Sequence, residues 1–424
     1  GGPVGFAVGG EYRRESSSFV PDVLEQQGYT FSNKLGITRG NFDVKEVFGE
    51  LDLPLVKDVP FIHVLDLSGA VRYADYSSTG KATTWKIDAA WAPIADIRFR
   101  GTISQAVRAP NIGELYGAAG QTYTFFDDPC LPSNRGLGKT TRPANCNAIL
   151  AQAGLTPAQI AGFEDTRSVN IAGTSSGNSA LSPEKAKTWT AGVVLQPRFI
   201  PRLQLSIDWY DIKLKQAINT VDAQKLAELC VDQATINNPF CASLVREAGT
   251  GLIVDYTVKP QNVAQFHTAG LDVNLNYTFK IEKVGNFGVK FIGSYLNALS
   301  FVDSPGAPPR SELGDTYEPR YQAFVSADYA TGPVALNYSV SWFGKTRRYS
   351  ADRLAGNPNY VDPKYAWYKQ RWVHSASASF TVNPKFEFYG GINNLFDQKP
   401  DLGSTTYPTE ASGRSFYAGA RARF

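Results

Sequence analysis

The sequence predicts an all-β fold, specifically a transmembrane, antiparallel, up-and-down β-barrel, on the basis of three observations. Apolar and polar residues alternate along many segments, as in GLDVNLNYTF (270–279), where Leu271, Val273 and Leu275 share one face. Many of these segments span 12 to 18 residues, which is longer than typical globular strands and long enough to cross a bilayer at a tilt. The connections between them alternate between short and long, as in barrels with tight turns at one rim and long loops at the other.

Period-two alternation by itself leaves two environments open for the apolar face. In a soluble sandwich that face packs into a core, whereas in a transmembrane barrel it meets lipid and the polar face lines a lumen. The alternation of short and long connections favours the barrel, because a sandwich has no reason to gather its long loops at one end. A soluble fold would instead bury Leu271, Val273 and Leu275 against a second sheet.

About fourteen strands are expected, each bounded by Gly, Pro, Asn or Asp. Short connections lie at 57–60, 92–94, 196–202, 281–286, 330–333 and 383–384, and long ones at 20–37, 108–183, 219–262, 303–316, 347–365 and 394–413. The segment 77–80 is the single short connection on the long-loop side. The strands are predicted at 2–19, 38–55, 61–76, 81–92, 94–107, 184–196, 202–218, 263–280, 286–302, 317–330, 333–346, 366–382, 385–393 and 414–424.

Composition and charge narrow the classes of function. With 42 Lys and Arg residues against 39 Asp and Glu, the net charge is +3, too balanced for a protein whose main partner is a nucleic acid. No apolar run approaches the ~20 residues of a membrane helix, so a membrane role must use strands. The mean hydropathy of -0.24 agrees with this, because a barrel presents only alternate residues to lipid.

The four cysteines fall in two close pairs within loop-like segments, Cys130 with Cys146 and Cys230 with Cys241. Four cysteines allow three connectivities, of which local pairing is the simplest, and disulfides indicate an oxidising compartment. Zinc binding is the alternative. It is disfavoured because neither pair has C-x-x-C spacing and the three histidines lie far away in sequence.

Two long loops carry helical patterns, and one strand carries an irregularity. In LTPAQIAGF, Thr156 is expected to be the N-cap, with Pro157 at the first helical position. In VDAQKLAELC, Asp222 is the expected cap. The alternation of LQLSIDWYDIKL changes phase around Trp209 and Tyr210, which predicts a β-bulge there or a strand that rises above the membrane.

Motifs of enzymatic chemistry are weak or missing from the sequence. LGKT (137–140) has Ser133 where a phosphate-binding loop requires glycine, and SPEK (182–185) has S-x-x-K spacing without the supporting motifs. No H-E-x-x-H, G-x-S-x-G or EF-hand pattern occurs. We therefore expect no enzyme activity, no cofactor and no resident metal.

Several segments together resemble the barrels of TonB-dependent outer-membrane receptors. VRAPNIGELY (107–116) is similar to the R-A-P-x-x-x-E-L-Y segment of that family, NLFDQKP (394–400) to its penultimate hairpin, and GRSFYAGARARF (413–424) to its closing strand. LSPEKAKTWTAGV and LSIDWYDIKLKQAI fit the same pattern. The family residues matched are Arg108, Pro110, Glu114, Tyr116, Asn394, Leu395, Phe396, Asp397 and the terminal aromatic Phe424.

The resemblance implies a receptor for energy-dependent uptake in the outer membrane of a Gram-negative bacterium. Since such receptors have 22 strands and a plug, it also implies that residues 1–424 are the C-terminal part of the barrel, with the plug and the first strands absent from this chain. The implied partners are outer-membrane lipid, the TonB energy-coupling protein acting through the plug, and a bulky cargo of the ferric siderophore, cobalamin or oligosaccharide class. A surface lipoprotein partner stays open.

Two alternative functions remain at this point, a passive porin-like channel and a soluble all-β binding or adhesion module. The family-like segment that begins at Arg108 is expected to anchor a loop rather than to contact a ligand. The candidate ligand contacts are aromatic and charged residues of the long loops, namely Tyr123, Phe125, Phe126, Asp127, Arg347, Arg348, Tyr349, Trp367 and Tyr368.

Overall fold

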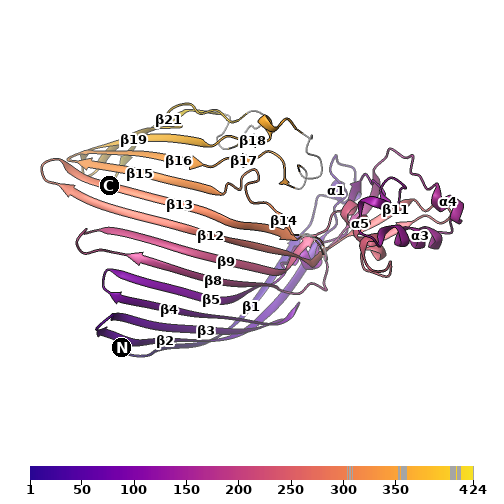
Figure 1. Ribbon diagram of the computed structural model, residues 1–424, viewed down its shortest axis with the longest axis horizontal. Helices are drawn as coiled ribbons and strands as arrows, with labels where there is room; N and C mark the ends of the chain where they lie inside the picture. Colours follow the sequence, from indigo (N-terminus) through magenta and orange to yellow (C-terminus); the bar gives the residue numbers. More distant parts are fainter. Residues whose placement is uncertain are drawn as a thin grey trace.

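One large antiparallel sheet dominates the computed structural model (Figure 1). The structure describes residues 1–302, 304, 307, 309–351, 354, 361–401, 407 and 412–423. Within this described part, no helix is both long and apolar enough to cross a bilayer. The dominance of antiparallel strands confirms the expected all-β architecture.

The strands of the large sheet pair in chain order, each antiparallel to its neighbours, as an up-and-down barrel requires. A further short strand, β14 (Arg310–Ser311), pairs with β13 outside this path. The path comprises β1 (Gly5–Phe19), β2 (Thr38–Val59), β3 (Ile62–Tyr76), β4 (Gly80–Ile94), β5 (Ile97–Arg108), β8 (Glu184–Leu195), β9 (Leu203–Thr220), β12 (Pro260–Ile281), β13 (Gly285–Val302), β15 (Tyr321–Thr331), β16 (Val334–Phe343), β19 (Arg371–Asn383), β20 (Phe386–Asn393) and β21 (Ser415–Ala422).

The predicted strands match this path closely, including the short connection between β3 and β4. Several strand starts differ by a few residues, and the two largest differences are β15, which begins at Tyr321 rather than 317, and β19, which begins at Arg371 rather than 366. The aromatic residues before β19 form a separate strand, β18 (Trp367–Tyr368), which pairs with β17 (Thr346–Arg347) away from the large sheet. The alternation of apolar and polar residues marks both segments as strands but does not show that they belong to different sheets.

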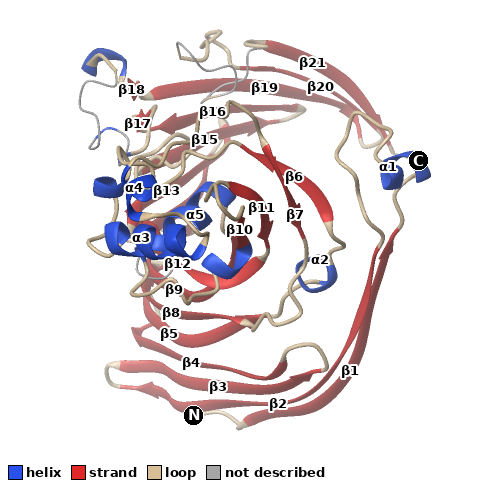
Figure 2. Cartoon of the chain, turned by 90° about the vertical axis from the view of Figure 1, so that its right-hand side faces the viewer, coloured by secondary structure: helices blue, strands red, loops and turns tan. Residues whose placement is uncertain are grey.

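The large sheet curls around an axis, and β1 and β21 form its two edges (Figure 2). Among the described residues, no pairing joins these two strands, so the barrel wall is open between them. The short turns gather at one rim and the long loops at the other (Figure 1). This is the arrangement that the alternation of short and long connections predicted.

The two faces of the sheet differ in chemistry, and we call the face that carries Leu271, Val273 and Leu275 the outer face. None of these three side chains is buried, so no second sheet covers them. Aromatic side chains pack in rows at both ends of this apolar band. Near the short turns Phe287 stacks between Phe279 and Tyr329, with ring centroids 5.1 and 5.0 Å apart.

The second aromatic row lies on the outer face toward the long loops. Tyr295 stacks on Tyr321 at 5.1 Å, and Trp342 packs on Trp372 at 5.7 Å. On β12, Leu271 lies opposite Tyr295 of one row, and Phe279 belongs to the other row. These two residues are eight positions apart, or about 26 Å along the strand. An apolar band between two aromatic rows is the pattern of a membrane-facing barrel wall.

The opposite, inner face is polar and held by ion pairs across strands. Arg100 of β5 donates to both carboxylate oxygens of Asp208 on β9, at 2.7 and 2.6 Å. The pair crosses over Gly192 of β8, where any Cβ would collide with the Asp208 carboxylate. Glycine is therefore required at this position.

The predicted bulge at Trp209 and Tyr210 is wrong, because β9 pairs in unbroken register through both residues. The register shifts instead on both sides of Ala264, which lies opposite Ala217, and the neighbouring Gln216 has a φ of 55°. The apparent phase change has another cause: beyond Trp209 the outer face becomes charged, starting with Asp211. This agrees with the second expectation, a strand that rises above an apolar band.

Two long loops fold together into a compact unit, which we call the loop domain (109–183 and 221–259; Figure 1). A small sheet, in the order β10-β11-β7-β6, packs with helices around one hydrophobic core. Its strands are β6 (Gly120–Thr124), β7 (Ile171–Ser175), β10 (Leu244–Arg246) and β11 (Ile253–Val258). Its helices are α2 (Ile112–Tyr116), α3 (Arg142–Gln152), α4 (Pro157–Ala161) and α5 (Ala223–Asp232), with 3-10 turns at Arg135–Leu137 and Cys241–Ser243. Elsewhere, α1 (Val23–Gln27) and a 3-10 turn at Pro363–Tyr365 lie in other long loops.

The predicted helices and disulfides of the loop domain are confirmed. Thr156 caps α4 with Pro157 at its start, and Asp222 caps α5. Cys130 is bonded to Cys146 and Cys230 to Cys241. Helix α3 was not predicted, because its N-cap residue makes no side-chain cap and its apolar residues show little helical periodicity.

Replacing Asp222 by alanine is expected to destabilise the loop domain by about 1 kcal/mol. The Asp222 carboxylate accepts a hydrogen bond from the Lys225 N–H at 2.8 Å, and this bond satisfies a helix-terminal donor. Hydrogen exchange of the α5 amides measures the change. Asp222→Asn keeps the acceptor and should exchange like the unaltered protein, so equal effects of both substitutions would contradict a capping role.

Candidate functional site

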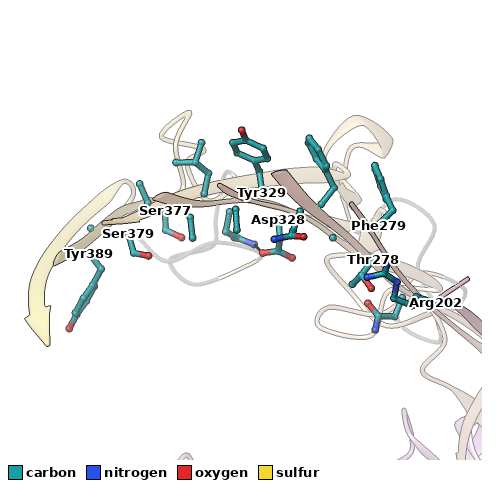
Figure 3. A pocket seen from close by; sticks show the side chains of 18 of the residues that line it. Arg202, Thr278, Phe279, Asp328, Tyr329, Ser377, Ser379 and Tyr389 are labelled. Atoms are coloured by element: carbon teal, nitrogen blue, oxygen red, sulfur yellow. Dashed lines mark hydrogen bonds between the residues drawn. The ribbon is translucent and has the colours of Figure 1, made fainter. Parts of the chain in front are cut away.

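The wall formed by β12, β13, β15, β16 and β19 surrounds a hollow of about 590 Å³ near the short turns. In Figure 3, Thr278, Asp328 and Ser377 point to one side of the sheet, while Phe279 and Tyr329 point to the other. The polar group continues along the inner face, where Asn337 donates to Asp328 at 2.7 Å. On this part of the wall, polar side chains point to one face and aromatic side chains to the other.

Arg108, at the end of β5, ties together two carboxylates at the long-loop rim. Its guanidinium donates to Glu184 at 2.6 and 2.9 Å and to Glu114 at 3.0 Å through both Nη atoms. Glu184 also accepts from the Ile218 N–H at 2.7 Å, and Glu114 accepts from the Asn111 N–H at 2.8 Å. These bonds connect β5, α2, β8 and β9.

The neighbouring residues of the same segment are packed rather than exposed. Pro110 is fully buried, and Leu115 is 2% exposed. Tyr116 lies so close to Gly40 of β2 that a Cβ there would collide with its ring. The segment therefore fixes the start of the loop domain onto the barrel wall, in agreement with the expected anchoring role.

The NLFD segment forms a tight turn after β20. The Asn394 side chain donates to the Gln398 carbonyl at 2.8 Å and accepts from its N–H at 2.7 Å. The Leu395 N–H donates to the His374 carbonyl, and Phe396 packs edge-on against the His374 ring at 4.8 Å. Phe424, the terminal aromatic, lies outside the described residues.

Asp397 closes this turn against the chain that leads into β21. Its carboxylate accepts from the Arg414 N–H at 2.9 Å and from Lys399 at 3.1 Å. These two donors, the backbone N–H first, hold the pKa of Asp397 below its usual range. The carboxylate is therefore charged at neutral pH and serves the hairpin rather than a ligand.

Cationic and aromatic side chains come together around the β17–β18 pair at the long-loop rim. Arg348 lies 4.2 Å above the Tyr368 ring, and Lys345 lies 4.9 Å above the Trp367 ring. Arg347 lies 6.0 Å from the same Trp367 ring. We call this group, together with Arg371, the arginine–aromatic cluster.

Within the described part of the chain, the cluster contains more cationic side chains than carboxylates paired with them. Arg347 donates to Asp315 at 2.8 Å, while Arg348 and Arg371 share one carboxylate, Asp401, at 3.3 and 3.5 Å. The Nε atoms of Arg348 and Arg371 are buried and have no hydrogen-bond partner among the described residues. Buried guanidinium donors without partners are costly, so this site favours an additional anion.

Glu318, on the loop before β15, lies in the same region as the cluster. Burial, and then the charge of Glu312, raise the pKa of the Glu318 carboxyl above its usual range.

The structure separates the predicted ligand contacts into two sets. Arg347, Arg348, Trp367 and Tyr368 meet in the cluster, and half-buried Tyr349 directly follows Arg348 in sequence. The other set lies on the loop domain. There Tyr123 and Phe125 are exposed, whereas Phe126 is buried against Tyr256 at 5.3 Å and Asp127 accepts from Asn134 at 2.6 Å.

Sequence reasoning missed Arg371, Asp315 and Asp401 as members of the cluster. Asp315 pairs with Arg347, 32 residues further along the chain, and Arg371 pairs with Asp401, 30 residues further along, so these pairs form only because the segments that carry them share a rim. No local pattern marks them. Among the described residues, no group of three or more His, Cys, Asp or Glu side chains is placed to hold a metal ion.

Known structures with the same fold include several receptors. The ferric enterobactin receptor PfeA of Pseudomonas aeruginosa, as a variant in complex with enterobactin, matches with a TM-score of 0.62 and 15% identity, over 99% of this chain and 52% of that chain. The siderophore receptor PirA of Acinetobacter baumannii gives 0.61 and 17%, over 100% and 52%. The ferric-catecholate import receptor Fiu of E. coli K12 gives 0.51 and 13%, over 99% and 52%.

The chain thus spans about half the length of the solved receptors it matches. At these identities the likeness shows the fold alone. The family evidence comes from the sequence: the family model described as TonB dependent receptor-like, beta-barrel matches residues 1–395. The chain therefore belongs to the TonB-dependent receptor-like β-barrel family.

Proposed function

We propose that this chain forms part of an outer-membrane receptor of a Gram-negative bacterium that takes up a bulky, anionic nutrient by TonB-coupled transport. The arginine–aromatic cluster is the observation that carries the proposal. It places unsatisfied cationic donors and aromatic faces at the long-loop rim of a wall that is apolar outside and polar inside.

The chemistry of the cluster favours a ferric siderophore over the other cargo classes. An anionic chelate supplies oxygen acceptors to Arg348 and Arg371, and its planar groups can stack on the Trp367 ring. Cobalamin and neutral oligosaccharides offer less charge for the guanidinium groups to bind. The similar receptor PfeA was solved with enterobactin, which supports this class without fixing the compound.

Replacing Arg348 and Arg371 together by glutamine should weaken binding of the cargo at least tenfold. Each hydrogen bond from a charged donor contributes about 1.5–3 kcal/mol. The measurement is a titration of the purified protein with a panel that includes ferric enterobactin, another anionic ferric siderophore, cobalamin and a neutral oligosaccharide. A cargo bound equally well by the unaltered protein and the double variant would contradict a role for the cluster.

Arg198→Gln is the matched control, because Arg198 is an exposed arginine that pairs with Asp96 at the opposite rim. It should leave cargo binding unchanged. In cells, uptake should stop when the proton-motive force is dissipated. Uptake that continues, with ion conduction in liposomes, would indicate the passive channel instead.

A further inference from the structure

Four lysines lie on the outer face of β8 and β9, beyond the apolar band. Lys185 lies directly opposite Lys215, and Lys187 lies opposite Lys213. All four are exposed. Residues 185 and 187 share the face of Trp189 because side chains alternate along a strand. We call this group the lysine quartet.

The quartet is electrostatically unfavourable by itself. Directly opposed residues have Cβ atoms about 4.5–5.5 Å apart, and like charges there are destabilising. One member of the quartet has an ion pair: Lys213 lies 3.7 Å from Asp211, whose carboxylate also contacts His267 at 3.2 Å. One carboxylate shared in this way leaves a strong surplus of positive charge.

Toward the long-loop ends of other strands, opposed residues on the outer face carry balanced charges. On β2, β3 and β4, Asp75 lies between Lys45 and Lys81, opposite both. On β1 and β2, Arg14 lies opposite Asp43, with 3.8 Å between their charged atoms. The uncompensated charge of the quartet is therefore a local feature of β8 and β9, not a general property of this rim.

Apolar residues follow the quartet toward the short turns. Trp189 is 44% exposed, and Ile103 lies opposite it on β5 with 59% exposure. Further along the same face, Val193 lies opposite Ile207. A ligand that covers this surface must present several negative charges to the lysines and hydrocarbon to the strands beyond them.

We propose that the lysine quartet binds the headgroup of a membrane lipid that carries two phosphate groups, with the acyl chains lying along β5, β8 and β9. Phosphate oxygens provide the charge that four ammonium groups lack. Hydrocarbon continuity with the apolar band selects a lipid over a soluble anion. The inference rests on the placement of the outer face in a membrane, which belongs to the proposed function.

The test is lipid binding by the protein purified in detergent, followed by native mass spectrometry and by the lipid-induced rise in Tm. The probes are diphosphatidylglycerol with two phosphates, phosphatidylglycerol with one, and zwitterionic phosphatidylcholine. Diphosphatidylglycerol should bind at least tenfold more tightly than phosphatidylcholine and should raise Tm. Lys185→Gln combined with Lys215→Gln should remove this preference while leaving the lipid-free Tm unchanged or higher, since a like-charge pair is relieved.

Lys45→Gln combined with Lys81→Gln is the matched control and should bind each lipid as the unaltered protein does. Three results would overturn the inference: equal binding of diphosphatidylglycerol and phosphatidylcholine, an unaffected quartet variant, or complete competition by equimolar pyrophosphate. Cargo titration is a separate measurement. If the unaltered protein shows no lipid preference but binds cargo normally, only the lipid site is refuted and the proposed function stands.

Discussion

Replacing Arg246 by leucine is expected to destabilise the loop domain by about 3–5 kcal/mol, the cost of leaving a buried charge without its partner. The Arg246 guanidinium donates to both oxygens of Asp128, at 2.7 and 2.9 Å, and the two side chains are only 6% and 1% exposed. Without Arg246, the one donor left to the Asp128 carboxylate among the described residues is the Cys130 N–H at 2.9 Å. Hydrogen exchange of the β10 and β11 amides measures the loss.

The matched control is the double variant Arg246→Leu with Asp128→Leu. Replacing a buried ion pair by apolar side chains is often neutral or stabilising, so the double variant should recover most of the lost protection. If the double variant is as unstable as the single variant, the loss of stability comes from the missing packing of the Arg246 side chain and not from the unpaired Asp128 carboxylate.

Replacing Leu275 by arginine should destabilise the barrel wall by about 2–4 kcal/mol, the cost of a charge at the lipid-facing midplane of a barrel. Leu275 lies midway along β12 between Leu271 and Phe279, the residues beside the two aromatic rows, and pairs with Leu205 and Phe291 on the outer face. Equilibrium unfolding by denaturant in lipid vesicles measures the change.

Asn276→Arg is the matched control, one residue further along β12. Asn276 lines the inner-face hollow, so an arginine there stays in a polar environment and should change stability little. Equal destabilisation by both substitutions would contradict the assignment of the outer face to lipid. The soluble binding module would then be favoured, although no second sheet covers Leu275 in this structure.

Much of the wall was predictable because its determinants are local. Alternating polarity specifies strand and face together, and turn residues mark the strand ends, so β12 could be placed from residues 270–279 alone. The caps at Thr156 and Asp222 were predictable for the same reason, since a cap acts within three residues of itself. The phase change at Trp209 could not decide between a bulge and a rising strand, because a change of environment along one face looks in sequence like a change of face.

The sequence by itself determined which residues form strands, which side of each strand is apolar, and which family the chain resembles. Only the tertiary structure decided which distant residues meet: Arg348 with Arg371 around Asp401, Arg246 with Asp128, and the opposed lysines of β8 and β9. The physical reason is range. Alternation and capping act over a few residues, whereas ion pairs and cross-strand contacts depend on how the loops pack and in which register neighbouring strands align.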